Sequence, residues 1–163
     1  VYGGNITGAV TSKYRPVIIF RLAEFYLLYA EMLNEVDPTN ADVLKYVNLV
    51  RSRAGLEDLE VLNPAIEGNQ ALQREAIRRE SRIELATEGQ RYFDVRRWMI
   101  ADKAPGQGGQ GGEFHGMNVD QPQPAYYTRT KLQTRSFKNK NYLYPIPLDE
   151  IKRSDVLVQN PGW

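Results

Sequence analysis

Apolar residues at three- and four-residue spacing predict that the first half of the chain is helical. Between Ile18 and Val36 this spacing is typical of an amphipathic helix, and the apolar positions are Leu22, Phe25, Tyr26, Tyr29, Met32, Leu33 and Val36. Pro38 ends this helix, and a second helix is expected over residues 41–54, with Gly55 at a left-handed cap. Two helices joined so closely resemble one tetratricopeptide-type hairpin.

The next segments predict a loop over residues 63–69, a third helix over 70–88 and a short fourth helix over 91–100. Residues 104–118 are rich in glycine and have no period, so a long irregular surface loop is expected there. Such loops often carry binding function.

The last third of the chain predicts extended structure. Side chains alternate between Ala125 and Phe137, which predicts a strand with one basic, solvated face. Two prolines keep residues 142–147 extended, and one or two helical turns are expected over 148–153. The chain then closes in an aromatic strap that ends at Trp163.

The predicted fold class is mainly α. It consists of tetratricopeptide-like helical hairpins over residues 18–101, followed by the irregular loop, a minor β segment and the strap over 102–163. We expect residues 1–163 to form a single domain that is the carboxy-terminal portion of a longer chain. One hairpin is too few repeats to stack, and the sequence begins without methionine or the features of a signal peptide.

Composition excludes several classes of site. A content of 42% hydrophobic residues and a net charge of +1 are typical of an ordinary globular protein and do not indicate a nucleic-acid binder. It has no cysteine, so disulfides, thiolate metal sites and cysteine nucleophiles are excluded. His115 is the only histidine, which excludes a zinc site of several histidines. We therefore expect no cofactor and no metal.

Three glutamates share one face of the predicted third helix. Glu80, Glu84 and Glu88 stand four residues apart, and like charges at that spacing weaken a helix unless basic groups face them. A general acid and base pair, as in glycosidases, is one interpretation. An ion-pair network with the many neighbouring arginines is favoured, because arginine keeps carboxyl groups ionised and unsuited to proton donation.

Two further patterns are weak. The glycines at 106, 108 and 111 match a nucleotide-binding spacing, but neither the strand nor the helix that such a loop needs flanks them. The basic run from Arg129 to Lys140 could form a platform for single-stranded nucleic acid, yet a solvated strand face fits the net charge better.

Four stretches, taken in order, resemble the SusD/RagB family. They are RLAEFYLLYAEMLNEV from Arg21, YVNLVRSRAGL from Tyr46, REAIRRESRIELATEGQRYFDVRRW from Arg74, and YLYPIPLDEI from Tyr142 with the final QNPGW. The resemblance implies a surface lipoprotein of the outer membrane in Bacteroidetes-type bacteria. It implies no catalysis, a SusC-like TonB-dependent transporter as partner, and a lipid anchor near an amino terminus that lies outside this chain.

The resemblance also implies an oligosaccharide ligand, with peptide capture and a purely structural docking module as alternatives. Sugar binding needs exposed aromatic faces and planar amide or guanidinium groups. Outside the motifs, the residues of these types that we expect at the ligand are Phe114, Asn118, Tyr126, Tyr127 and Arg129.

Overall fold

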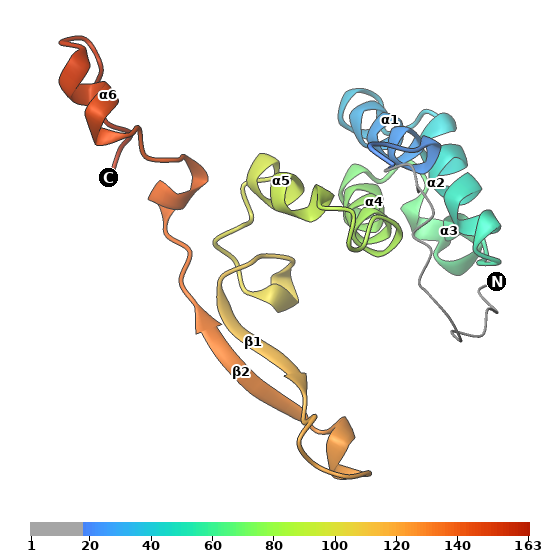
Figure 1. Cartoon of the computed structure of the whole chain (residues 1–163). Coiled ribbons are helices and arrows are strands. Elements are labelled where there is room, and N and C mark those ends of the chain that lie inside the picture. The colour runs from blue at the N-terminus through green and yellow to red at the C-terminus, as the bar shows by residue number, and fades with distance from the viewer. Residues whose placement is uncertain (1–17) are drawn as a thin grey trace, which may run out of the picture. The chain divides into compact units, whose positions relative to one another are not determined.

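The computed structural model describes residues 18–163. They divide into two compact units, and the boundary in the chain lies between Glu84 and Leu85. The first unit is helical (Figure 1). Its helices are α1 (Leu22–Val36), α2 (Asp42–Arg53), α3 (Leu59–Leu62) and α4 (Gln70–Glu84), with a 3-10 turn at Pro64–Ile66. The predicted helices over 18–36 and 41–54 are confirmed, although α1 begins at Leu22.

α1 and α2 form the predicted hairpin, and α4 packs against both. Their shared core consists of aliphatic side chains with almost no exposed surface, among them Leu27, Val43, Val47 and Ile77. The ring of Tyr46 in α2 lies 5.2 Å from that of Tyr26 in α1. Burial of these apolar groups supplies the main stabilisation of the unit.

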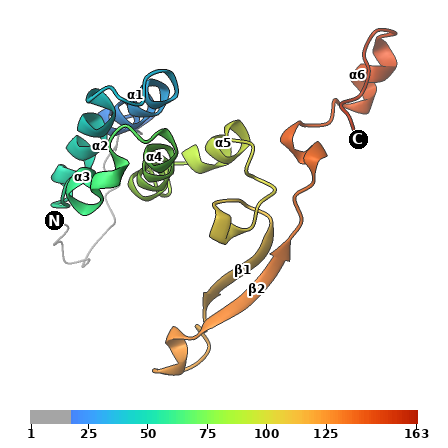
Figure 2. The ribbon, with the colours of Figure 1, turned by 180° about the vertical axis from the view of Figure 1, so that it is seen from behind.

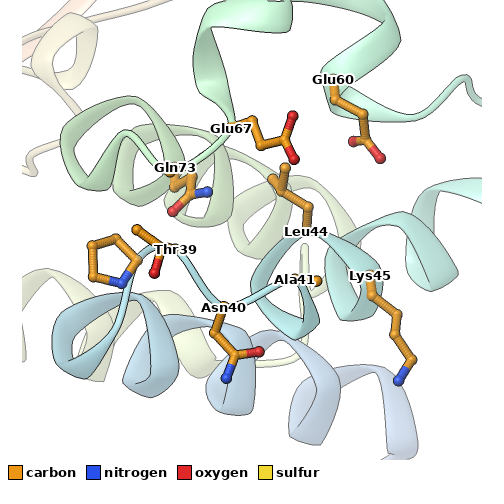
Figure 3. A pocket seen from close by; sticks show the side chains of 10 residues that line it. Thr39, Asn40, Ala41, Leu44, Lys45, Glu60, Glu67 and Gln73 are labelled. Carbon is orange, nitrogen blue, oxygen red and sulfur yellow. The ribbon is translucent and has the colours of Figure 1, made fainter.

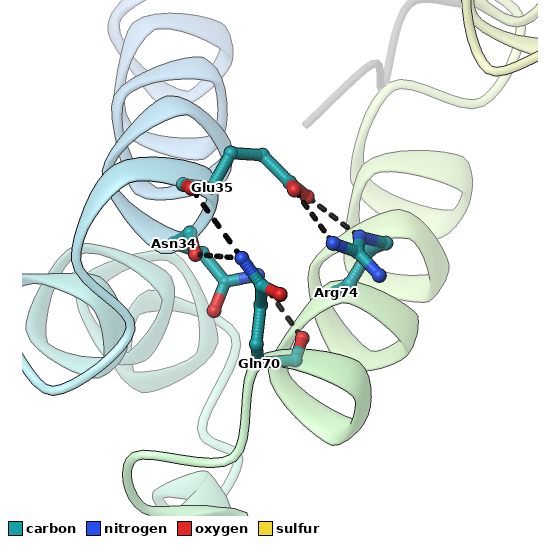
Figure 4. Close-up of polar contacts among 4 residues, drawn as sticks. All are labelled: Asn34, Glu35, Gln70 and Arg74. Carbon is teal, nitrogen blue, oxygen red and sulfur yellow. Dashed lines mark hydrogen bonds and ion pairs between the residues drawn. The ribbon is translucent and has the colours of Figure 1, made fainter.

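The end of α1 is joined to the start of α4 by polar contacts (Figure 4). Asn34 donates from Nδ2 to the Gln70 carbonyl at 3.1 Å, and Gln70 donates from Nε2 to the Asn34 carbonyl at 3.0 Å. Beside them, Nε and Nη2 of Arg74 donate to the two carboxylate oxygens of Glu35, each at 2.6 Å. The hydrogen bond from Arg74 lowers the pKa of Glu35. These contacts fix the angle at which α4 leaves the hairpin.

The α4 glutamates form the predicted ion-pair network. Arg51 of α2 donates from Nη1 to Glu80 Oε2 at 2.9 Å, and both side chains are buried. Glu84 accepts from Arg21 and from Arg53, so three segments converge on its carboxylate. The favoured interpretation of these glutamates is therefore confirmed for Glu80 and Glu84.

The predicted third helix is too long. α4 ends at Glu84, and Glu88 lies in the connection that follows. Thr87 has a φ of 70° and Gly89 a φ of 86°, both in the left-handed region, where a right-handed helix cannot continue. The next helix, α5 (Gln90–Arg97), is shorter than the predicted 91–100 at its end.

The second unit contains α5, strands β1 (Gly112–Met117) and β2 (Arg129–Arg135), and α6 (Leu148–Arg153) (Figure 2). The two strands pair antiparallel, from Gly112 opposite Arg135 to Met117 opposite Arg129, with an irregularity between Phe114 and His115. One 3-10 turn, Pro105–Gln107, precedes β1, and another, Ala125–Tyr127, lies in the connection between β1 and β2. The fold class, mainly α with a small β segment, is confirmed.

The expected irregular loop over 104–118 is wrong in its second half, which is β1. Its glycines serve close packing: a Cβ on Gly109 would lie 2.0 Å from the Lys103 carbonyl oxygen, and one on Gly111 would lie 2.8 Å from that of Asp102. The chain therefore folds back against residues 100–103 and enters the strand. The predicted strand over 125–137 is likewise too long, because Tyr126 and Tyr127 belong to the 3-10 turn.

The carboxy-terminal segment binds to itself, as expected of a strap. Gln159 accepts from the Ile146 backbone N–H at 2.8 Å and donates to its carbonyl at 2.9 Å. Trp163 donates from Nε1 to the carbonyls of Lys140 and Leu143, and the Lys140 ammonium lies 4.2 Å from the centre of its ring. The last residue is thereby fixed to the 3-10 turn Asn139–Tyr142.

The buried ion pair gives a stability prediction. Substitution Glu80→Gln leaves Arg51 as a buried charge without its carboxylate, so the free energy of unfolding should fall by about 3 to 5 kcal/mol. Urea unfolding followed by circular dichroism measures it. Lys45→Gln, which breaks the exposed pair with Asp42, is the control and should have no measurable effect. Equal effects of the two variants would contradict a structural role for the buried pair.

Candidate functional site

Two cavities that open on the described residues of the helical unit are small. The first, about 170 Å³, is lined mainly by polar side chains from the turn after α1 and from the segments that follow it (Figure 3). The second, about 230 Å³, is lined by Leu59, Leu62, Asn63, Ile66, Leu72, Glu75, Ala76 and Arg79. Ligand pockets usually measure about 300 to 1,000 Å³. Neither cavity contains an aromatic face on which a sugar could stack.

The β1–β2 hairpin carries all five residues that the sequence predicts at the ligand. Phe114 lies in β1, Asn118 follows β1 directly, Tyr126 and Tyr127 form the 3-10 turn, and Arg129 begins β2. Residues distant in the chain are thus brought to one element. Every residue of β2 is exposed, so both faces of this strand are open to solvent.

Four of the five residues lie at the tip of the hairpin. The Asn118 backbone N–H donates to the Tyr126 carbonyl at 3.1 Å, and Arg129 begins β2 opposite Met117, the last residue of β1. The rings of Tyr126 and Tyr127 meet edge to face, with centroids 5.3 Å apart. The Tyr127 side chain is 59% exposed, and its hydroxyl accepts from Gln123 Nε2 at 3.0 Å. The tip therefore presents one accessible aromatic ring, that of Tyr127, which is fixed by a hydrogen bond to its hydroxyl.

Phe114 stands apart from the tip. It pairs with Gln133, four residues along β2 from Arg129, which is roughly 13 Å at the strand rise. The Arg135 guanidinium lies 3.6 Å from the centre of the Phe114 ring and covers one of its faces. The hairpin thus offers two aromatic positions rather than one five-residue cluster.

The hairpin also contains residues that sequence reasoning missed. His115 lies beside Arg129, with 3.4 Å between its Nδ1 and the guanidinium Nη2. Lys131 donates to Glu113 at 2.6 Å, and this hydrogen bond lowers the pKa of Glu113. The signal for these neighbours was the stretch GEFHGM, which becomes a partner of β2 only once it is identified as a strand.

The segment after β2 makes aromatic and polar contacts to α5 and to the residues that follow α5, and these contacts hold the base of the hairpin. The Arg96 guanidinium lies 3.5 Å from the centre of the Tyr92 ring and 5.3 Å from that of Phe137. Tyr142 donates from its hydroxyl to Asp102 Oδ1 at 2.6 Å, and this bond is the largest cause of the lowered pKa of Asp102. A hydrogen bond with the Tyr144 hydroxyl raises the pKa of Tyr92.

The described residues offer little for metal or acid–base chemistry. Across 18–163 no group of three or more His, Cys, Asp or Glu side chains is placed to hold a metal ion. Glu80 and Glu84 are both engaged by arginines. Within the same range, no helix combines the length and apolar character that a membrane span requires.

Comparison with known proteins gives consistent matches. The sequence pattern that defines the SusD family matches residues 3–163. SusD-like protein P2 of Formosa agariphila is 32% identical over an alignment of 163 positions, which covers 98% of this chain and 28% of that protein. SusD-like protein P25 of the same organism is 33% identical over 144 residues, 88% of this chain and 23% of that protein.

Solved structures agree. A SusD-like protein from Bacteroides fragilis is 39% identical with a TM-score of 0.74, covering 90% of this chain and 26% of that one. Surface glycan-binding protein A from Bacteroides uniformis is 26% identical with a TM-score of 0.52, covering 87% of this chain and 27% of that one. The chain spans about a quarter of the length of the proteins it matches.

The contact at the hairpin base predicts a pKa change. Tyr142→Phe removes the hydroxyl that stabilises the Asp102 carboxylate, so the pKa of Asp102 should rise towards its ordinary value of 3.8. In the native protein the hydrogen bond from Tyr142 contributes fully to stability at pH values above 3.8, the ordinary pKa of Asp102. This contribution is lost as the pH falls through the lowered pKa of Asp102. Carbon NMR of the Asp102 carboxyl measures the titration.

The matched control is Tyr144→Phe, which removes the bond to Tyr92 and leaves that to Asp102 intact. The pKa of Asp102 should not change in this variant. A pKa of Asp102 that is the same in the native protein and in Tyr142→Phe would show that the hydroxyl does not hold the carboxylate.

Proposed function

The chain belongs to the SusD family, and from this membership we propose that it is part of a non-enzymatic protein that binds oligosaccharide nutrients at the cell surface. Support comes from the family match over residues 3–163 and from the likeness to a surface glycan-binding protein. The single observation that carries the ligand class is the exposed Tyr127 ring at the hairpin tip, with the Gln123 amide hydrogen-bonded to its hydroxyl. Such a surface can stack on sugar C–H groups and bind hydroxyls.

The contacts of the α4 glutamates support a binding protein rather than an enzyme. A glycosidase needs two carboxyl groups across a cleft, one of them able to donate a proton. Glu80 and Glu84 accept hydrogen bonds from arginines, and they lie in a network that joins helices. These glutamates therefore serve packing in our proposal.

The cellular setting is proposed from the family. The protein would lie on the outer membrane as a lipoprotein, anchored through a segment outside this chain, and would deliver its ligand to a SusC-like TonB-dependent transporter. Peptide capture would replace sugar binding in the same arrangement if peptides, and not oligosaccharides, bound to the protein.

We further propose that the chain is the carboxy-terminal portion of a longer protein. Its matches are about four times as long. The outer face of α1 supports this proposal, because it exposes a heptad-spaced apolar stripe: Leu22, Phe25, Tyr29, Met32 and Val36. A stripe of this spacing is typical of a helix–helix seam. The occupant that we propose is a helix of the preceding segment, stacked on α1 as in tetratricopeptide arrays.

The tip predicts a binding defect. In Tyr127→Ala the stacking face is lost, so affinity for a bound oligosaccharide should fall by about fivefold, as expected for a contact of about 1 kcal/mol. Isothermal titration calorimetry of the complete protein against a panel of oligosaccharides measures it. Phe93→Ala, which removes another exposed ring outside the hairpin, is the control. An equal loss in both variants would contradict the assignment of the tip, and binding of peptides alone would replace the ligand class.

The stripe predicts protection from solvent. The 163 residues contain no cysteine, so Met32→Cys introduces one thiol into the stripe. In the complete protein this thiol should react with a maleimide about tenfold or more slowly than that of Ser52→Cys, an exposed site on α2. Equal rates would contradict an intramolecular cover. Protection that arises only when the transporter is added would assign the stripe to that partner instead.

A further inference from the structure

One face of the hairpin is rich in hydrogen-bond donors. Side chains alternate along a strand, so the odd-numbered residues of β2 from Arg129 to Arg135 share a face, and the register adds their partners in β1. We call this set the donor face. Gly112 adds no side chain, and the other members are Phe114, His115, Met117, Arg129, Lys131, Gln133 and Arg135.

The acceptors on and beside the donor face are already engaged. The Nδ1 atom of His115 faces the Arg129 guanidinium at 3.4 Å. Glu113 accepts from the Lys131 ammonium at 2.6 Å. In the amide orientation that satisfies its hydrogen bonds, the Gln133 oxygen accepts from Arg135 Nη2 at 2.8 Å. A ligand that needs to donate hydrogen bonds would find these acceptor atoms occupied, apart from the second carboxylate oxygen of Glu113, which lies 3.7 Å from His115 Nε2.

Donors remain available. A guanidinium carries five N–H donors and no acceptor. No carboxylate in residues 18–163 pairs with Arg129 or Arg135, whose contacts are to His115, Gln133 and the Phe114 ring. Stacking on the Phe114 ring leaves the in-plane N–H groups of Arg135 that do not donate to Gln133 available to a ligand. All of β2 is exposed, so a ligand can reach these donors.

The net charge of the hairpin region is more positive than that of the whole chain. Residues 112–140 contain five basic side chains and two acidic ones, a net charge of +3 with histidine neutral, whereas the whole chain carries +1. The positive charge of the chain is therefore concentrated on the hairpin and the turn that follows it. A sugar hydroxyl both donates and accepts, but a carboxylate or a sulfate only accepts, and guanidinium forks match such groups bidentately.

We propose that the donor face binds an acidic saccharide, one whose rings carry carboxylate or sulfate groups. The proposal rests on the proposed function, because it narrows the oligosaccharide class that the same hairpin takes. In it Arg129 and Arg135 bind the acidic groups, and the Tyr127 ring at the tip stacks on a neighbouring sugar ring.

The test uses matched pairs of probes on the complete protein. Calorimetry compares an oligomer of galacturonic acid with its methyl ester, and dextran sulfate with dextran, so that only the charge differs within each pair. The acidic member of at least one pair should bind about tenfold or more tightly than its neutral partner. The pair that shows this preference distinguishes carboxylate from sulfate. The preference should weaken in high salt, because exposed charges are screened.

Variants assign the effect to the donor face. Arg129→Gln combined with Arg135→Gln should remove the preference, so that the acidic member of the pair binds no more tightly than its neutral partner. Arg129→Gln alone keeps the Phe114 stack and should reduce the preference in part. Lys152→Gln, which removes one exposed charge on α6, is the matched control and should leave the preference intact.

The outcomes separate this inference from the proposed function. Equal binding of acidic and neutral probes, or an equal effect of Lys152→Gln, would overturn the acidic ligand while oligosaccharide binding stands. Binding of none of the four probes, with peptides bound instead, would overturn both.

Discussion

The helical unit depends on carboxylates of α4 that are neutralised by arginines from other segments. Glu80 is buried against Arg51, and Glu84 joins Arg21 to Arg53, so one helix face ties together the entry to α1, the end of α2 and α4. A buried carboxylate without a cation would be very unfavourable. The same pairing that fixes the helices therefore gives these glutamates a structural role.

The hairpin is built on different principles, because its strands bury little and its surface is open. Glycines pack its entry against residues 100–103. At its base Tyr142 donates to Asp102, and the Arg96 guanidinium lies over the Phe137 ring. The tip and the donor face are then free to present aromatic rings and guanidinium groups. Rigid attachment at the base with exposed chemistry above is the arrangement that a ligand-capturing loop requires.

Local sequence patterns predicted the helices and ion pairs that depend on residues close together in the chain or on composition. The periods of α1, α2 and α4 and the excess of arginine around Glu80 and Glu84 were sufficient for the helices and the ion pairs. β1 was missed because a strand of GEFHGM depends on pairing with β2, twelve residues further along the chain. α3 was missed because its start is held from α2, where Asn48 Oδ1 accepts from the Leu59 N–H at 3.1 Å. The hairpin residues expected at the ligand lie on one element, but only the structure separates Phe114 from the tip.

The function that we propose requires that the hairpin contact the ligand. This contact can be tested by hydrogen exchange of the complete protein, measured by mass spectrometry with and without an oligosaccharide that binds in the calorimeter. We expect slower exchange in peptides covering residues 112–135 and unchanged exchange in α1, α2 and α4. Slower exchange confined to those helices, with none in the hairpin, would contradict it.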